Sequence, residues 1–438
     1  MKKALWVMAM SLAMSGGMVW ADEPENAAMK AEIEVLKARL ARLEGQVSSD
    51  MRGGSSGIGG KTVAGLLELP SGLSGVQLSG YVDTSYSYNF AEPEAVTSDT
   101  TNAGATTTRT TRGRAFDTES NGFTPHVAKL VIEKPESDSS PIGFRTDLFF
   151  GDDAEVIHAT GAGIASDQFD LEQAYVTAKA PLGAGVDFKV GKFVTLLGSE
   201  VIESPSNWNF SRSFLFLYSI PFTHAGALAS YPLGEWGSVT GGVVNGWDNV
   251  DDNNKAKSLI GNITLTPHEG VSLALNGITG AEQNSNSRER RTVLDLVATW
   301  QAMDKLAFMA NYDFGHDGAV APTGYDSKEW SGLALYAKYD LTDKWSLAGR
   351  WEWFDDKDNF RSALTSAKTV TIGGTDTSFT PRDLNLTEWT LTSQWKLYEH
   401  LLARLEYRHD QASQTVFLHH GTFDNSQDTV SAEMVYHF

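Results

Sequence analysis

The sequence has no cysteine among its 438 residues. This absence excludes disulfide bonds, thiolate metal sites and covalent haem attachment through a Cys-x-x-Cys-His motif. Long apolar runs are missing too. Beyond the N-terminal segment, no stretch approaches the roughly 20 apolar residues that a membrane-spanning helix needs. The chain is therefore not a helical membrane protein.

Basic residues are scarce. The chain has 35 Lys and Arg residues against 55 Asp and Glu residues, so its formal net charge is -20. No basic stripe is visible, and nucleic acid is not expected as a partner. The Asp- and Asn-rich run from Asp248 to Asn254 has no glutamate at EF-hand spacing, and the pair His419-His420 stands in a loop. We interpret both as turn or surface features, and we predict no metal site, no cofactor and no enzymatic activity.

The N-terminus has the organisation of a secretory signal peptide. Two lysines follow the first methionine, residues 4–19 are apolar, and Val19-Trp20-Ala21 places small residues at the −3 and −1 positions before Asp22. Residues 1–21 are therefore predicted to be a signal peptide, and the protein is predicted to be exported.

Residues 22–50 carry apolar positions at spacings of three and four. The seam of a coiled coil is formed by Met29, Ile33, Leu36, Leu40, Leu43 and Val47. This pattern predicts a periplasmic coiled-coil helix that associates with copies of itself through residues 29–47. A solvated, single amphipathic helix is the alternative. A flexible Gly/Ser-rich linker is predicted over residues 51–75.

From residue 76 onward, apolar and polar residues alternate. Trp345, Leu347 and Trp351 share one face of a strand, whereas Arg350 and Glu352 share the other. Apolar rows that begin or end in Trp or Tyr are typical of membrane barrels, whose outer face meets lipid. The fold class is therefore predicted to be all-β: a transmembrane, antiparallel, up-and-down β-barrel over residues 76–438, preceded by the short coiled-coil helix.

The predicted barrel has about 16 strands, an even number as expected for outer-membrane barrels. The alternating segments are 76–90, 125–134, 142–151, 170–180, 186–192, 222–232, 236–246, 257–267, 270–279, 290–301, 304–315, 329–341, 344–356, 384–397, 400–410 and 428–438. Fourteen or eighteen strands are the alternatives, because the boundaries near residues 160–195 are weak. Short and long connections alternate, which is typical of periplasmic turns and external loops.

The chain ends on an aromatic residue of the last strand. This position of Phe438 resembles the signal that the bacterial barrel-assembly machinery reads. We predict that the protein lies in the bacterial outer membrane, in contact with its lipid, and that the N-terminal helix is periplasmic.

The inward positions of these strands carry many charges. The predicted lumen-lining residues are Arg145, Asp147, Lys189, Arg350, Glu352, Arg404, Glu406 and Arg408. Charges that face a packed interior are very costly, whereas charges that face water are not. The pattern therefore predicts a water-filled lumen. Neighbouring charges of opposite sign also allow a role in stabilising the wall, and this role is compatible with a pore.

The connection 193–221 is unusually apolar for an external loop. Glu200, Glu203 and Arg212 are embedded among its Phe, Leu, Trp and Ile residues, and Lys192 precedes it. Folding back into the lumen would bury the apolar side chains and bring the charges to the channel axis. These four charged residues are predicted to form a pore constriction. The alternative is an external loop that packs against its neighbours or at a subunit contact.

Four segments resemble stretches of a known family, the OmpL-like beta-barrel porins of the outer membrane: KFVTLLGSEVIE, NFSRSFLF, PFTHAG and NGWDNVDDNN. The likeness runs from about residue 76 to the end. It implies an outer-membrane channel of loosely defined substrate, without a catalytic role for these segments. The coiled-coil pattern resembles the N-terminal extensions of some trimeric porins, which implies a homotrimer joined through the barrel walls and the helix.

The predicted function is passive diffusion of small hydrophilic solutes or ions through a water-filled barrel that the connection 193–221 narrows. The alternative is a structural barrel that sheathes or anchors a partner complex, either as an envelope tether or as part of an electron-transfer conduit. The sequence leaves the preference for cations or anions open.

Overall fold

The computed structural model describes residues 75–93, 111–137, 140–164, 167–318, 326–364, 366–372, 375–379, 382–420 and 422–438. The predicted signal peptide, the predicted coiled-coil helix and the predicted linker up to residue 74 lie outside the described residues. Among the residues that are described, no helix combines the length and the apolar character needed to cross a bilayer.

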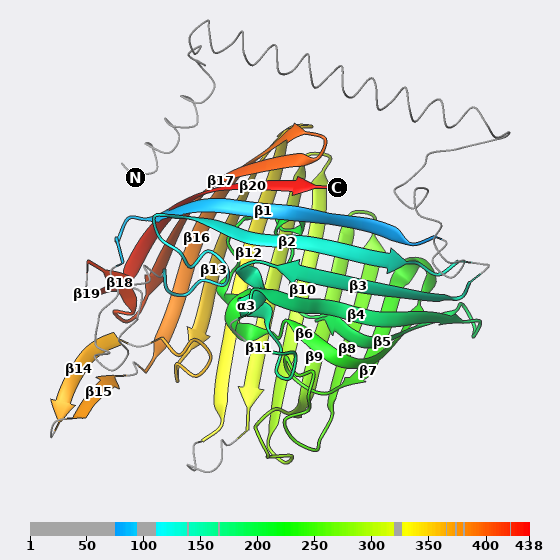
Figure 1. The fold of residues 1–438 in the computed structure, drawn as a ribbon, viewed down its shortest axis with the longest axis horizontal. Helices are drawn as coiled ribbons and strands as arrows, with labels where there is room; N and C mark the ends of the chain where they lie inside the picture. The colour runs from blue at the N-terminus through cyan, green and yellow to red at the C-terminus, as the bar shows by residue number, and fades with distance from the viewer. Residues whose placement is uncertain are drawn as a thin grey trace, which may run out of the picture. The chain divides into compact units, whose positions relative to one another are not determined.

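Sixteen antiparallel strands close into a barrel, in which each barrel strand pairs with the next barrel strand and the last pairs with the first (Figure 1). The barrel strands are β1 (Gln77–Asn89), β2 (Gly122–Lys134), β3 (Ile142–Phe150), β4 (Phe169–Ala180), β5 (Val186–Val194), β6 (Thr223–Pro232), β7 (Gly237–Val244), β8 (Ser258–His268), β9 (Val271–Ala281), β10 (Arg290–Met303), β11 (Leu306–Asp317), β12 (Lys328–Thr342), β13 (Trp345–Asp356), β16 (Leu384–Tyr398), β17 (Leu401–Ala412) and β20 (Ser426–His437). The predicted all-β barrel and its number of strands are confirmed.

Short elements occupy the connections between barrel strands. They are α3 (Asp153–Ile157), η4 (Ser204–Ser206), η5 (Leu215–Ser219), η6 (Gly234–Trp236) and two hairpins, β14 (Ser366–Ile372) with β15 (Thr375–Phe379) and β18 (Phe417–His419) with β19 (Thr422–Asp424). The hairpins form separate two-stranded sheets and take no part in closing the barrel.

The C-terminal strand closes the barrel. β20 pairs with β1, beginning with Tyr81 opposite His437. The next residue, Phe438, exchanges two main-chain hydrogen bonds with Gly80, at 3.1 and 3.0 Å. A Cβ at Gly80 would lie 2.1 Å from the carbonyl oxygen of Lys129. Glycine at this position therefore lets the closing strand approach β1 and β2.

The two faces of the wall differ in exposure as the alternation predicts. On β9, the outward-facing Leu273 and Leu275 are 41% and 47% exposed, whereas the inward-facing Asn276 and Ile278 are buried. Large apolar side chains are exposed in the same way on every side of the barrel, and soluble monomers rarely show so continuous an apolar surface. The outer face is therefore suited to contact with hydrocarbon.

Replacing Leu275 with arginine is expected to lower the free energy of unfolding by about 2–4 kcal/mol, the range for a cationic side chain near the midplane of a barrel's lipid face. Denaturant unfolding in lipid bilayers measures this change. The control is Leu275→Met, which is expected to cost less than about 1.5 kcal/mol. Equal stability of the two variants would show that this face does not contact hydrocarbon.

The connections differ in length at the two ends of the barrel. Turns of two residues, such as 343–344 and 399–400, lie at the end where β1 begins and β20 finishes, whereas the opposite end carries long connections such as 195–222 and 357–383. Short periplasmic turns and long external loops are the rule for outer-membrane barrels. The short-turn end is therefore assigned to the periplasm.

Candidate functional site

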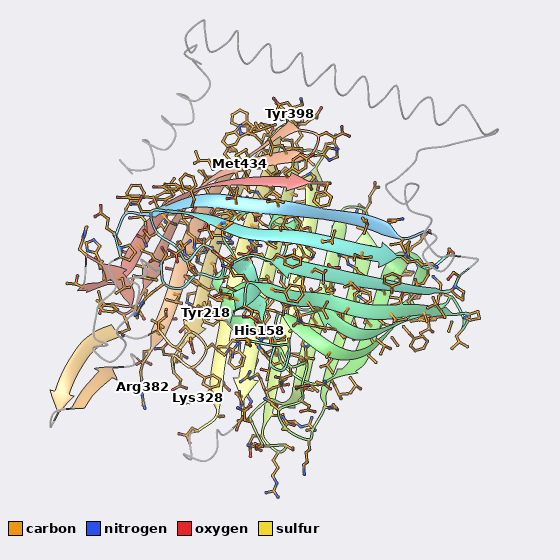
Figure 2. The ribbon with its side chains drawn as sticks, in the orientation of Figure 1. His158, Tyr218, Lys328, Arg382, Tyr398 and Met434 are labelled. Atoms are coloured by element: carbon orange, nitrogen blue, oxygen red, sulfur yellow. The ribbon has the colours of Figure 1, made fainter. Side chains whose placement is uncertain are left out.

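The connection 195–222, called the inserted segment below, packs inside the barrel. Its residues Phe214 and Leu215 are 0% and 1% exposed, and they share one apolar cluster with residues of the inner wall. Tyr218, labelled among the side chains in Figure 2, stacks on Phe354 of β13 with ring centroids 5.8 Å apart. Apolar packing therefore holds the segment within the lumen.

Two wall glutamates bind the main chain of the inserted segment. Glu406 of β17 accepts hydrogen bonds from the N–H groups of Phe210 and Ser211, at 2.7 and 2.9 Å. Glu352 of β13 accepts hydrogen bonds from the N–H groups of residues 214–215, at 2.6 Å each. Each carboxylate thus satisfies two buried donors, and hydrogen bonds to a charged acceptor are about twice as strong as neutral ones.

Wall arginines bind the carbonyl groups of the same segment. Arg350 of β13 donates to the carbonyl oxygen of Ser211, and Arg404 of β17 donates to that of Asn207, at 2.6 Å in both cases. Arg408 makes the same type of bond further along the segment. Carboxylates and guanidinium groups on β13 and β17 therefore bind both the N–H groups and the carbonyl groups of the inserted main chain.

The predicted lumen-lining residues fall into two groups in the structure. Those on the inner wall beneath the inserted segment are no more than 2% exposed: Arg350, Glu352, Arg404, Glu406 and Arg408. Asp147 on β3 is likewise buried. Arg145 and Lys189 are partly exposed, on the half of the lumen nearer the short turns. Most of the inward charges therefore face the inserted segment rather than open water.

The four predicted constriction residues are each engaged by protein groups. Lys192 pairs with Asp170 at 2.9 Å, and Glu200 pairs with Arg350 at 2.6 Å. Arg212 donates hydrogen bonds to three carbonyl groups of its own segment. The fourth residue, Glu203, lies in a charge cluster with residues of β2, β3 and β4. The four residues therefore do not form one cluster. Each has its own partners, on the wall or within the inserted segment.

The cluster around Glu203 contains two residues that the sequence did not suggest, Lys129 and Glu172. The Lys129 ammonium lies 2.5 Å from Glu203, 2.9 Å from Asp147 and 2.6 Å from Glu172. Oxygens of the three carboxylates lie within 4.8 Å of one another, a spacing that could hold a metal ion. The ammonium group of Lys129 supplies the positive charge at this position.

A β-bulge explains why the sequence did not predict that Glu172 faces inward. Asp147 is opposite Gln173, and Leu148 is opposite Leu171, so Glu172 is an extra residue on β4. Gln173 donates a hydrogen bond to Asp147 at 3.0 Å and therefore also points inward. A bulge breaks the period of two, so strict alternation cannot place both side chains on the inner face.

A serine, a histidine and an aspartate are hydrogen-bonded in series beside this cluster. His126 Nε2 lies 2.7 Å from Ser85 Oγ, and His126 Nδ1 lies 2.8 Å from Asp153 Oδ1. The three residues are no more than 4% exposed, and the His126 ring packs against Phe210 of the inserted segment. The order is that of a nucleophile, a base and an orienting acid. Buried in this way, the series holds α3 against β1 and β2.

The β3–β4 connection and the β7–β8 connection meet over the end of the inserted segment. The N–H group of Thr160 donates to the carbonyl of Asp248 at 2.8 Å, and the N–H group of Val250 donates to the carbonyl of Thr160 at 2.9 Å. The Asp248 carboxylate accepts hydrogen bonds from the N–H groups of residues 222–223. Burial raises the pKa of Asp248 to about 6. The Asp- and Asn-rich run is therefore a turn that fastens the inserted segment.

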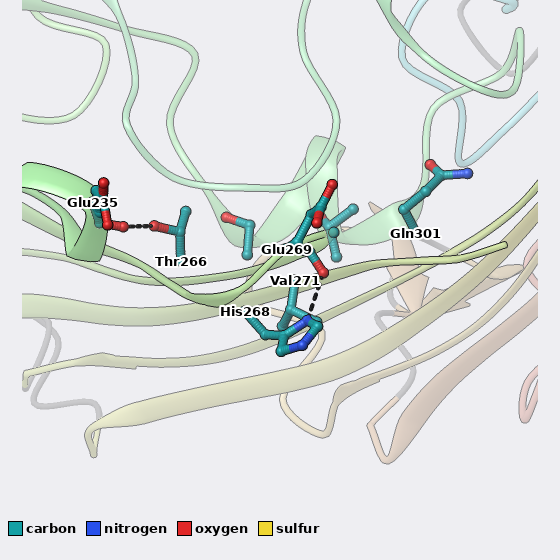
Figure 3. A pocket seen from close by; sticks show the side chains of 9 residues that line it. Glu235, Thr266, His268, Glu269, Val271 and Gln301 are labelled. Carbon is teal, nitrogen blue, oxygen red and sulfur yellow. Dashed lines mark hydrogen bonds between the residues drawn. The ribbon is translucent and has the colours of Figure 1, made fainter. Parts of the chain in front are cut away.

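Two hollows lie at the short-turn end of the barrel. The first, of about 520 Å³, is bordered by Glu235 and His268, and its polar groups bond locally, as His268 does to the carbonyl of Glu269 (Figure 3). The second, of about 440 Å³, is bordered by Lys338 and Lys396 on the inner faces of β12 and β16. The second hollow therefore belongs to the periplasmic mouth of the lumen.

A family comparison decides what kind of barrel this is. Residues 75–438 match the family described as "Putative beta-barrel porin-2, OmpL-like". The chain belongs to this porin family. The resemblance seen in four sequence segments is therefore confirmed. Family and fold together make this porin a passive channel of the bacterial outer membrane and point away from an enzyme.

Solved porin structures share the fold of this porin. The anion-selective porin from Comamonas acidovorans is 12% identical, with a TM-score of 0.54 over 83% of this chain and 99% of that chain. OmpF from Salmonella typhi is 9% identical, with a TM-score of 0.53 over 83% and 97%. The outer membrane channel DcaP of Acinetobacter baumannii is 11% identical, with a TM-score of 0.51 over 83% and 97%. No curated protein sequence matches the chain significantly.

Proposed function

We propose that this porin lets small hydrophilic solutes or ions diffuse through a lumen that the inserted segment narrows. The observation that carries the proposal is the burial of residues 195–222 against the inner wall of a closed barrel that belongs to a porin family. Partly exposed polar residues on the inner wall nearer the short turns support a water-filled entrance there. No catalytic step is part of this function.

The predicted constriction residues contribute to the narrowing by fixing the inserted segment. Glu200 and Glu203 attach it to two different strands of the wall, to Arg350 on β13 and to Lys129 on β2. Arg212 holds its main chain in a compact turn. Lumen width is therefore proposed to depend on these attachments more than on a ring of free charges.

The porin is further proposed to form a homotrimer through its barrel walls and residues 29–47, which lie outside the described residues. The heptad pattern of the N-terminal segment supports this arrangement. Recognition by the barrel-assembly machinery is proposed to use Phe438, whose main chain pairs with Gly80 at the barrel seam.

Recording from planar lipid bilayers tests the function directly. Purified, folded protein is expected to produce stepwise increases in ionic conductance, and the same sample after heat denaturation should produce none. A folded barrel that conducts no ions at any applied voltage would overturn the proposal and would favour the structural alternative.

A further inference from the structure

Every strand of the barrel contributes a buried inward side chain. A set with one residue per strand, each no more than 4% exposed, is Ser85, His126, Phe149, Glu172, Phe193, Leu228, Val244, Ile260, Ile278, Val293, Asp313, Ala334, Glu352, Thr392, Glu406 and Ser431. This ring runs round the whole circumference. If an open channel ran along the wall at this level, the inward side chains of some strands would be exposed to water. None of the sixteen is.

The space inside the ring is filled as well. Leu197, Leu215 and Ile220 of the inserted segment are no more than 3% exposed, and they belong to the same apolar cluster as the wall residues Ile260 and Val293. Packed protein interiors contain few voids larger than a water molecule, and an ion pays a very large desolvation cost to enter apolar surroundings. The packed layer is therefore a barrier to hydrated ions.

The barrier occupies only part of the lumen. Nearer the short turns, the inward-facing Thr240, Thr264 and Ala274 of β7, β8 and β9 are partly exposed. This half is an open vestibule that ends at the inserted segment. The inserted segment is thus the element that separates the vestibule from the opposite mouth.

We infer that the structure shows a closed channel and that the inserted segment is its gate, so that conduction requires the segment to move within the barrel. The inference rests on the proposed function. It follows from the packed layer, because every barrel strand has a buried inward residue there and apolar side chains of the segment pack against them.

The bonds that hold the gate to the wall differ in type from the bonds that join the wall strands to one another. The wall strands are joined by continuous main-chain ladders, which a membrane barrel cannot open without exposing unpaired groups to lipid. The gate is held by side chains, such as Asn209 Nδ2, which donates to Thr392 Oγ1 of β16 at 2.7 Å. Water within the lumen can replace bonds of this type. The inserted segment can therefore move while the barrel stays closed on itself.

A reversible cross-link tests the gate. The chain has no cysteine, so Asn209→Cys/Thr392→Cys introduces one defined thiol pair between the gate and the wall. A short, reducible, bifunctional thiol reagent joins the pair, and mass spectrometry of the digested protein confirms the bridge. Bilayer conductance is measured before bridging, after bridging and after reduction. The single variants Asn209→Cys and Thr392→Cys, treated with the same reagent, are the controls.

Bridging is expected to abolish most of the conductance of the double variant, and reduction is expected to restore it, while the single variants stay unaffected by the reagent. A bridged double variant that conducts like its reduced form would overturn the gate and leave the porin function intact. Absence of conductance in the wild type and in every reduced variant would instead overturn the porin function itself.

Discussion

The double variant Glu352→Ala/Glu406→Ala is expected to conduct much more than the wild type and to unfold more easily. Each glutamate accepts two main-chain N–H groups of the inserted segment. Leaving a buried donor without a partner costs about 1–3 kcal/mol. If the substitutions raise the free energy of the closed state by only about 3 kcal/mol relative to the open state, the ratio of open to closed channels rises roughly a hundredfold.

Single-channel recording gives the open fraction, and denaturant unfolding in bilayers gives the stability. The matched control is Glu399→Ala, because Glu399 lies exposed in the β16–β17 turn and makes no contact with the inserted segment. If the alanine variant does not fold, Glu352→Gln/Glu406→Gln keeps an acceptor oxygen at each position and is expected to show a smaller increase of the same sign. An open fraction equal to that of the wild type in both variants would contradict this role.

Replacing Lys129 with alanine is expected to cost about 3–5 kcal/mol of unfolding free energy, the range for removing one partner of a buried charge pair. The substitution leaves Asp147, Glu172 and Glu203 close together without the ammonium they share. Asp147 and Glu172 are fully buried, so water compensates for the lost positive charge only in part. Repulsion among the carboxylates adds to the loss.

A second substitution and a matched control show whether charge is the cause. Adding Glu172→Gln to the Lys129→Ala variant removes one of the three negative charges and is expected to recover part of the stability. Lys179→Ala breaks a pair with Asp187 that is 3.4 Å long and largely exposed, so it is expected to cost less than about 1 kcal/mol. Equal losses of unfolding free energy in Lys129→Ala and Lys179→Ala would show that the buried Lys129 ammonium does not stabilise the three carboxylates.

Calcium offers a further readout on the Lys129→Ala variant. The three carboxylates have the spacing of a hard-cation site once the ammonium is gone. Millimolar calcium is therefore expected to stabilise this variant more than the wild type. An identical response of the two proteins would show that the carboxylates move apart when the lysine is removed.

Strand positions followed from the sequence because the outer face of a membrane barrel is apolar along its whole length. Trp345 and Trp351 alternate with Arg350 and Glu352 over enough residues to locate β13 without any partner strand. Closure by the last strand followed too, since every strand edge in a bilayer must be paired. These are local or generic constraints, which a single sequence carries in full.

The surroundings of the inward charges did not follow from the sequence. Arg350 points inward as the alternation requires, yet one of its two carboxylate partners, Glu200, lies 150 positions away, on the inserted segment. Glu172 points inward only because a bulge shifts the alternation on β4. Period two indicates the face of a strand; it does not indicate whether that face meets water, a folded-in loop or another charge.

By itself, the sequence determined the class of the protein, the sixteen strands and the apolar outer face, because alternation and turn spacing are properties of neighbouring residues. Only the tertiary structure decided what fills the lumen, which charges pair there and that Lys129 balances three acids. Those facts depend on contacts between segments far apart in the chain. The energy of a buried charge is set by the partners that folding brings to it.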